Sequence, residues 1–231
     1  FDRIALHPPF MPVLHSSQIY HGGGQDGEQI TRKHIEDLPG RLNPGGRLHC
    51  HCMATDREGQ PFEQRLRRWL GEHSADFDIA IHVAGYIDRS KFILSTVRSG
   101  RTKPEEIPVW EETFRAMKLE RLLKAHFVIQ RRESDRPVFT VRRDEGPYSA
   151  AGELAWLIAF ETARAAQGPS FPLHSRLKSN PVIALNIVQT CQTQAWAVRK
   201  MTAEVLHPYP VKRDIDPVIA RILPQLDGTH T

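Results

Sequence analysis

The stretch of sequence that decides the fold is FDRIALHPPF, at residues 1–10. Its first six residues form a short apolar segment that is typical of a β-strand. Proline has no N–H to donate to a sheet, so Pro8 and Pro9 must end the strand after His7. In open α/β sheets, ligands bind beyond the carboxyl ends of the strands. The tetrapeptide His7-Pro8-Pro9-Phe10 is therefore a candidate site.

The chemistry of this tetrapeptide suits the orientation of an amine. Two successive prolines fix the backbone and leave carbonyl oxygens available as acceptors. His7 adds a polar side chain, and Phe10 supplies a flat wall for a planar group. Such a clamp would orient a nitrogen lone pair toward an electrophilic methyl group, and methyl transfer depends mostly on positioning. Taken alone, the tetrapeptide is explained equally well as a rigid turn from strand to loop.

Strand and helix patterns alternate from this motif to Gln130, which predicts an α/β fold around a mostly parallel sheet. The turn Asn43-Pro44-Gly45-Gly46 precedes one of the strands. A capping-box spacing from Asp26 to Gln29 predicts the start of a helix that Pro39 should end or kink. The expected strands are at 1–6, 47–54, 77–83 and 122–130, and the expected helices are at 26–42, 61–70 and 107–117.

The second part of the chain has a different pattern. It predicts a helix at 152–166, two strands within 181–206 and a helix that starts at Pro217. The segment 138–141 is either a hairpin partner of the preceding strand or the start of this part. We expect a domain at 1–132, a linker at 133–150 and a small α+β module at 151–231.

Three segments in this order resemble one known family: FDRIALHPPF, HGGGQDGEQI before a helix, and LNPGGRLH before a strand. They are similar to class I S-adenosylmethionine-dependent methyltransferases that carry an NPPY or NPPF motif after the fourth strand. That family includes the release-factor glutamine methyltransferases and the ribosomal RNA guanine N2-methyltransferases, with the "methyltransferase small" domain. The resemblance covers 1–132, where LLKAHFVIQRR is similar to the family's last strand.

The resemblance implies a fold and a site. This chain would supply strands four to seven of a seven-stranded Rossmann-like sheet, so we expect an N-terminally truncated fragment that holds the C-terminal half of the catalytic domain. His7, Pro8, Pro9 and Phe10 would be the catalytic residues, and His7 would also lie near S-adenosyl-L-methionine. No glycine-rich loop directly follows a strand, so the rest of the cofactor site is expected in the missing half. The isolated fragment is then expected to be inactive.

The implied activity is N-methylation of a protein side chain, a nucleobase or a small-molecule amine. The family usually has Asn where this chain has His7. A neutral histidine can accept through one ring nitrogen and donate through the other, so the clamp survives with altered geometry. Two alternatives stay open: an O-methyltransferase that uses His7 as a base, or a non-catalytic RNA- or protein-binding module on a degenerate methyltransferase fold.

Composition sets few limits on the partners. The 231 residues carry a net charge of +4, and 40% of them are hydrophobic. No apolar run is long enough to cross a membrane, and three cysteines suit a reducing cytoplasm, so we expect a cytoplasmic protein with no membrane partner. The tail ending in Leu226-Asp227-Gly228 faintly resembles small winged-helix-like modules.

Several other features invite functional interpretations. His49, Cys50, His51 and Cys52 alternate along a strand, so they cannot converge on one metal, and a strand buried on both faces is expected instead. The arginines could contact RNA, although a solvated helix face explains those at 65–68 more simply. Tyr20 with the glycines at 22–24 could form a lid. The arginines in question are Arg65, Arg67, Arg68, Arg131, Arg132, Arg136, Arg142 and Arg143.

Overall fold

A computed structural model describes residues 1–15, 22–144, 151–168, 170–171, 175–176, 178–179, 182–192, 195–206 and 211–229. The chain divides into two compact units, Phe1–Tyr148 and Ser149–Thr231. The boundary between them falls inside the segment 133–150. We describe each unit by itself.

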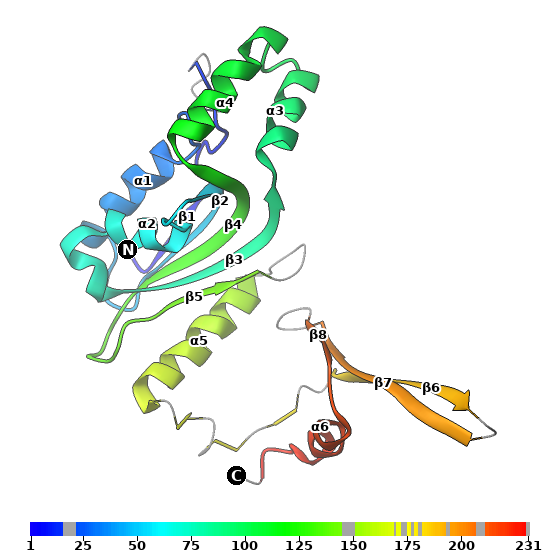
Figure 1. The fold of residues 1–231 in the computed structure, drawn as a ribbon. Coiled ribbons are helices and arrows are strands. Elements are labelled where there is room, and N and C mark those ends of the chain that lie inside the picture. The colour runs from blue at the N-terminus through cyan, green and yellow to red at the C-terminus, as the bar shows by residue number, and fades with distance from the viewer. Residues whose placement is uncertain are drawn as a thin grey trace. The chain divides into compact units, whose positions relative to one another are not determined.

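The first unit is built on a five-stranded mixed sheet with the order β1-β2-β4-β3-β5 (Figure 1). β1 runs parallel to β2, and β5 runs parallel to β3, whereas β4 is antiparallel to both of its neighbours. The sheet is therefore mixed: β1, β2, β3 and β5 run in one direction, as expected of a mostly parallel sheet, and β4 alone runs in the opposite direction. The strands are β1 (Arg3–Leu6), β2 (Arg47–Arg57), β3 (Phe77–Ile87), β4 (Leu119–Arg131) and β5 (Thr140–Arg143).

The direction of β4 follows from the connection before it. Two helices join β3 to β4 and bring the chain back to the end of the sheet that it has just left. The turn into β4 passes through Lys118, whose φ of 52° is left-handed. The segment 138–141 does not form a hairpin with β4, because β5 pairs with β3 instead.

The helices of this unit contact the sheet in two groups. α1 and α2 cover one face, where their apolar side chains pack against β2, β3 and β4. α3 and α4 form a second core around Phe92, Trp110 and Phe114, against Met53 and Leu122. The bounds are α1 (Gln29–Glu36), η1 (Leu38–Gly40), α2 (Phe62–Trp69), η2 (Gly71–Asp76), α3 (Arg89–Arg98), η3 (Pro104–Glu106) and α4 (Ile107–Ala116).

The start of α1 differs from the expected capping box. The helix begins at Gln29, and the carboxylate of Asp26 accepts the backbone N–H of Glu28 at 2.9 Å instead of capping the helix. Pro39 ends the helix early, as expected, because α1 stops at Glu36 and a 3₁₀ turn follows. α3 was not anticipated. Its N-cap is Asp88, which accepts the amides of Ser90 and Lys91.

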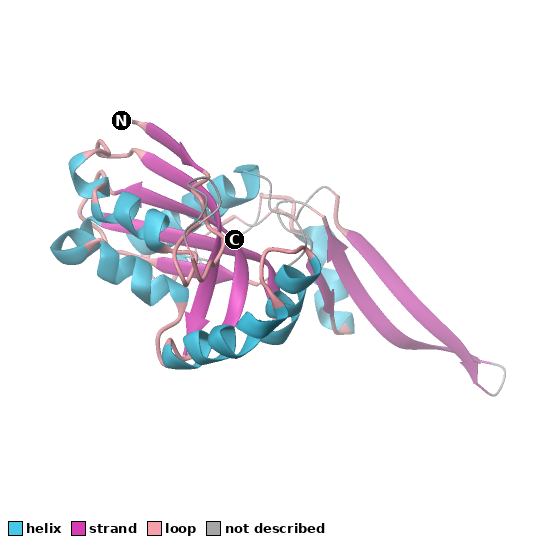
Figure 2. Ribbon diagram, turned by 90° about the horizontal axis from the view of Figure 1, so that it is seen from above, coloured by secondary structure: helices cyan, strands magenta, loops and turns pink. Residues whose placement is uncertain are grey.

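The described part of the second unit holds two α-helices and a three-stranded antiparallel sheet with the order β6-β7-β8. The two expected strands are confirmed as a long hairpin, which projects beyond β8 and α6 (Figure 2). The elements are α5 (Ala151–Gln167), β6 (Ala184–Gln192), β7 (Ala195–Val205), β8 (Val211–Asp214), α6 (Pro217–Ile222) and η5 (Leu223–Gln225). Among the described helices, none is both long and apolar enough to cross a membrane.

Candidate active site

β1 and β2 together determine where the motif lies. Leu6, the last residue of β1, is in register with Cys50, and Pro8 and Pro9 then turn the chain away. His7 therefore lies beside His51, with ring centroids 5.4 Å apart. β2 continues beyond Cys50 to Arg57, whereas β1 ends at Leu6. The motif therefore leaves the sheet beside the middle of β2.

His7 begins a row of histidines across one face of the sheet, which we call the histidine row. His51 on β2 and His82 on β3 are both in register with His126 on β4. The rings of His51 and His126 have centroids 5.9 Å apart. His7 and His51 are exposed, His126 is half-buried and His82 is buried. The row thus begins next to the edge strand β1, crosses β2 and β4, and ends at the buried His82 on β3.

The exposure of His51 corrects the expectation for β2. The face with Cys50 and Cys52 is buried under α1 and α2, but His51 on the opposite face is exposed and His49 is only half-buried. The first half of β2 is therefore buried on one face only, whereas from Cys52 to Asp56 the strand is buried on both faces, as expected. The sequence pattern that separates the cysteines from the histidines was correct, and it also marks the face that carries the row.

His51, the second histidine of the row, has a lowered pKa, which favours its neutral form. Partial burial and then the nearby His7 lower the pKa of His51 below its ordinary value. Partial burial, Arg3 and Arg47 lower the pKa of His49. Neutral imidazole has one donor and one acceptor nitrogen, so His51 can take part in a hydrogen-bond network beside His7 at neutral pH.

This lowered pKa predicts how stability depends on pH. Between the folded pKa of His51 and its ordinary value of 6.5, the unfolded chain binds more protons than the folded chain. The free energy of unfolding should therefore decrease as the pH falls through this window. Urea denaturation at pH 7.5, 6.5 and 5.5 measures the effect, and His51→Gln should flatten the dependence. A dependence in His51→Gln that equals that of the wild-type protein would contradict the assignment.

Phe10 and the prolines give the motif its shape. Phe10 is half-buried, and its ring lies 5.1 Å from His7 and 6.3 Å from His51 between centroids. It also packs against both hydrophobic cores. Pro8 is buried, and within the described ranges no group donates a hydrogen bond to its carbonyl oxygen.

The glycine-rich loop folds directly against the motif. The N–H of Gly23 donates to the carbonyl of Met11 at 2.9 Å, and the N–H of Val13 donates to the carbonyl of Gly24 at 3.0 Å. Gly27 has a φ of 77°, and a Cβ built there would lie 2.3 Å from the Phe10 carbonyl oxygen. Glycine is required at this position both for its backbone conformation and for the close approach. Tyr20, the other part of the expected lid, lies outside the described residues.

A cavity of about 490 Å³ adjoins the motif, and sequence reasoning missed it. One wall is the loop that follows Phe10, and the opposite wall is the connection from α3 to α4. Inside, the indole N–H of Trp110 donates to the hydroxyl of Thr102 at 3.1 Å, and the two side chains are buried. The aromatic stripe of α4 was visible in the sequence, but without α3 nothing indicated that a cavity opens there. The lining residues are Met11, Pro12, Val13, Leu14, His15, Gly22, Thr96, Gly100, Arg101, Thr102, Lys103, Glu106 and Trp110.

The turn Asn43-Pro44-Gly45-Gly46 lies at the other end of the sheet. The N–H of Asn43 donates to the carbonyl of Phe1 at 2.9 Å, and that of Gly45 to the carbonyl of Arg131 at 2.9 Å. The turn therefore joins the amino end of β1 to the entry into β2. It positions the strand that carries the motif and does not itself reach the site.

The helix arginines do not form a solvated face, which corrects that expectation. Arg65 is buried and forms an ion pair with Glu28. Arg67 donates to the backbone carbonyls of Ser74 and Phe139. Of the three, Arg68 alone is exposed.

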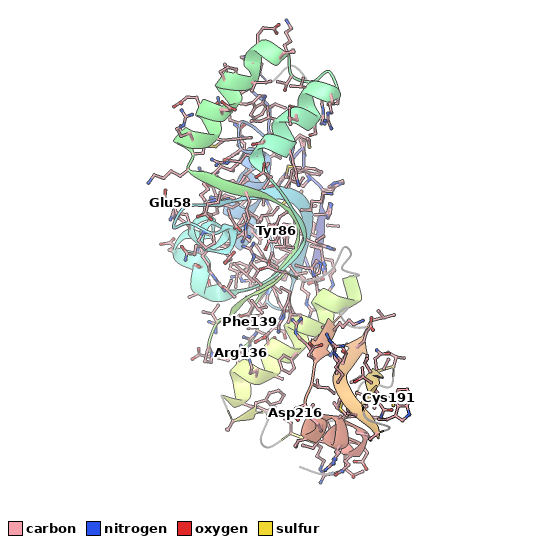
Figure 3. All side chains as sticks on the ribbon, turned by 45° about the vertical axis from the view of Figure 1, so that its right-hand side comes forward. Glu58, Tyr86, Arg136, Phe139, Cys191 and Asp216 are labelled. Carbon is pink, nitrogen blue, oxygen red and sulfur yellow. The ribbon has the colours of Figure 1, made fainter. Side chains whose placement is uncertain are left out.

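Most arginines of the junction are engaged inside the unit as well. Arg131 donates to the carbonyls of Pro39 and Leu42, and Arg136 pairs with the buried Asp78 beside Phe139 (Figure 3). Arg142 donates to both oxygens of Asp56 at 2.9 Å. The contacts of Arg136 and Arg142 fasten β5 and the segment before it to the sheet, and of the five arginines in this cluster Arg143 alone is exposed.

In the described ranges, no three histidine, cysteine, aspartate or glutamate side chains lie close enough to hold a metal ion. Comparison of the sequence with models of known protein families and with curated proteins found no match. The fold and site described above therefore carry the functional argument.

Proposed function

We propose that this protein transfers a methyl group from S-adenosylmethionine to a substrate nitrogen, with the motif His7-Pro8-Pro9-Phe10 as the clamp for the nucleophile. One observation carries the proposal. An apolar strand ends at its carboxyl end in His7, and the Pro8 carbonyl that follows has no hydrogen-bond donor among the described residues. A primary or secondary amine could donate to this carbonyl while His7 accepts or donates a second hydrogen bond. Two such contacts orient the lone pair.

The order of the strands supports the methyltransferase part of the proposal. β2 and β3 run parallel, and the later strand β4 lies antiparallel between them, with β1 outside β2. This is the arrangement of strands four, five, seven and six in class I methyltransferase sheets. The outer edge of β1 pairs with no described strand, on the side where the first three strands of that fold would lie. We therefore assign the first unit to the C-terminal half of such a sheet.

The residues of this chain fit only one end of the cofactor. S-adenosylmethionine would supply an electrophilic methyl group, and the exposed His7 is placed to lie beside it. The glycines at 22–24 fold against Met11 and the residues after it instead of joining a strand directly to a helix. They do not form the turn that grips a nucleotide in Rossmann-like folds. The contacts to the ribose and to the amino acid are therefore not assigned to residues of this chain.

The engaged arginines favour catalysis over the alternative of a non-catalytic RNA-binding module. Phosphate binding needs several cationic side chains on one accessible face. Arg65, Arg131 and Arg142 are instead bound by carboxylates or carbonyls inside the unit. An O-methyltransferase with His7 as base uses the same residue, so the test below separates it from the clamp.

The proposal predicts two measurable properties of the full-length protein. Isothermal calorimetry should detect binding of S-adenosylhomocysteine, and the absence of heat would overturn the methyltransferase assignment. With an amine substrate, His7→Ala should lower the turnover by roughly 100-fold, because the nucleophile loses one of its two orienting contacts. His7→Asn should keep most of the activity, since an amide also accepts and donates.

The control is His34→Ala, which removes an exposed histidine of α1 and should leave the turnover unchanged. If His7→Asn is as inactive as His7→Ala while cofactor binding persists, then His7 acts as a base and the clamp is wrong. This result would favour O-methylation.

A further inference from the structure

The hairpin of the second unit has a part that no other described element covers. β8 pairs with β7 only at Thr202–Val205. Beyond that point β6 and β7 pair only with each other, in a two-stranded ribbon that we call the hairpin arm (residues 187–192 and 195–201). Figures 1 and 2 both show the arm extending past β8 and α6 of its own unit.

The arm is apolar although it is exposed. Trp196 is 69% exposed, and Ile187, Val188 and Val198 are 46–49% exposed. A two-stranded hairpin is marginally stable in water, because it has no third strand or helix to bury its side chains. Exposed apolar side chains on such a ribbon mark a surface for binding. A partner is therefore needed to explain a long and apolar arm.

The two edges of this sheet differ in charge, and the difference indicates which edge can pair with a further strand. β8 forms one edge as far as Thr202, and three of its four residues are charged: Lys212, Arg213 and Asp214. Along the arm the outer side of β7 takes its place as the edge, and this strand carries Arg199 and Lys200. Charges of this kind block the addition of further strands. β6 forms the other edge, and its nine residues, ALNIVQTCQ, include no charge and no proline. Its outer side pairs with no strand in the described part of the chain.

We infer that β6 is the pairing edge of a homodimer, in which it joins β6 of a second copy in antiparallel orientation. A second copy suits this edge because antiparallel pairing about a two-fold axis is self-complementary. Each copy offers the same row of backbone donors and acceptors, and neither brings a charge that would repel the other. The two arms then form a continuous four-stranded ribbon, and the exposed apolar side chains of both copies lie next to each other.

The oligomeric state of the full chain tests this inference. Light scattering coupled to size-exclusion chromatography should give the mass of a dimer at micromolar concentration. Val188→Lys places two like charges across the two-fold axis and should raise the dissociation constant of the dimer about tenfold or more. The matched control is Val198→Lys on β7, which adds the same charge at a similar exposure but on the strand that does not join the second copy. A protein that is still monomeric at about 100 µM would overturn the inference.

A second measurement does not depend on how the variants fold. Cys191 on β6 is exposed, whereas Cys50 and Cys52 are buried, so a nitroxide label should attach selectively at Cys191. Pairing centred on Val188 separates the two labelled backbones by about 20 Å, from six residues at about 3.4 Å each. Pulsed electron paramagnetic resonance should detect a distance below about 35 Å between the nitroxide labels of the two chains, in any register that pairs most of β6. A dimer that lacks this distance, or equal weakening by Val188→Lys and Val198→Lys, would show that another surface is used.

Discussion

Replacing Glu28 with alanine is expected to lower the free energy of unfolding by about 3–5 kcal/mol, because it leaves a buried arginine without its counter-ion. Glu28 and Arg65 have side chains that are only 2% and 4% exposed. Glu28 also accepts the N–H of Thr55 at 2.7 Å and its hydroxyl at 2.8 Å. The variant removes all of these contacts together.

The directions of the two pKa shifts explain why the loss should be large. Burial raises the pKa of Glu28, although Arg65 acts to lower it, and burial lowers the pKa of Arg65. Desolvation therefore outweighs attraction for both partners, and an unpaired Arg65 would bear this penalty alone.

The control for this prediction removes both charges. The double variant Glu28→Gln/Arg65→Met should be closer to the wild type than Glu28→Ala, because the glutamine keeps an acceptor for Thr55 and no buried arginine is left without a counter-ion. Urea denaturation followed by circular dichroism measures both proteins. A loss below about 1 kcal/mol for Glu28→Ala would mean that water reaches Arg65 and that the pair is not desolvated.

Gly27→Ala is the second large effect, and it tests the contact between the glycine-rich loop and the motif. The added methyl group would lie 2.3 Å from the Phe10 carbonyl oxygen, at a residue whose φ is 77°. We expect a loss of about 2–4 kcal/mol in the free energy of unfolding, from the strained backbone and from displacement of the loop. The near-ultraviolet circular dichroism should also change, because Phe10 belongs to both cores.

Gly59 offers a matched comparison for this variant. Its φ is 65°, but a Cβ built there meets nothing within 4 Å. Gly59→Ala should therefore lose only the cost of the left-handed backbone, about 1–2 kcal/mol. Equal losses in the two variants would show that the close approach to Phe10 does not contribute.

The sequence allowed a good prediction of the elements that show a clear pattern. The alternation in β2 separated Cys50 from His51, and the helical stripe of α4 identified Trp110 and Phe114. The stop at Pro8 was predictable because proline cannot extend a strand. These features are local, so a short window of sequence contains the physical cause.

The features that sequence reasoning missed depend on contacts between distant residues. Nothing near Leu119 indicates that β4 enters between β2 and β3, because the pairing partners lie more than 30 residues away. Arg65 was expected on a solvated face because its partner, Glu28, is the N-cap of α1 and lies 37 residues earlier in the chain. The histidine row likewise appears only when the register brings His51 and His126 together. The motif His7-Pro8-Pro9-Phe10 was selected from sequence as a candidate site, but the residues that surround it were not predicted.

The position of β4 also has a consequence for how the chain folds during synthesis. A ribosome releases β2 and β3 before it releases the strand that lies between them. Until residues 119–131 emerge, two long apolar strands have no partner for the edges that will face β4, and the sheet cannot form. Such non-local pairing is slow, and unpaired edges invite association with other chains. Assembly of the first unit therefore waits for its fourth strand, and a nascent chain at this stage is a natural target for chaperones.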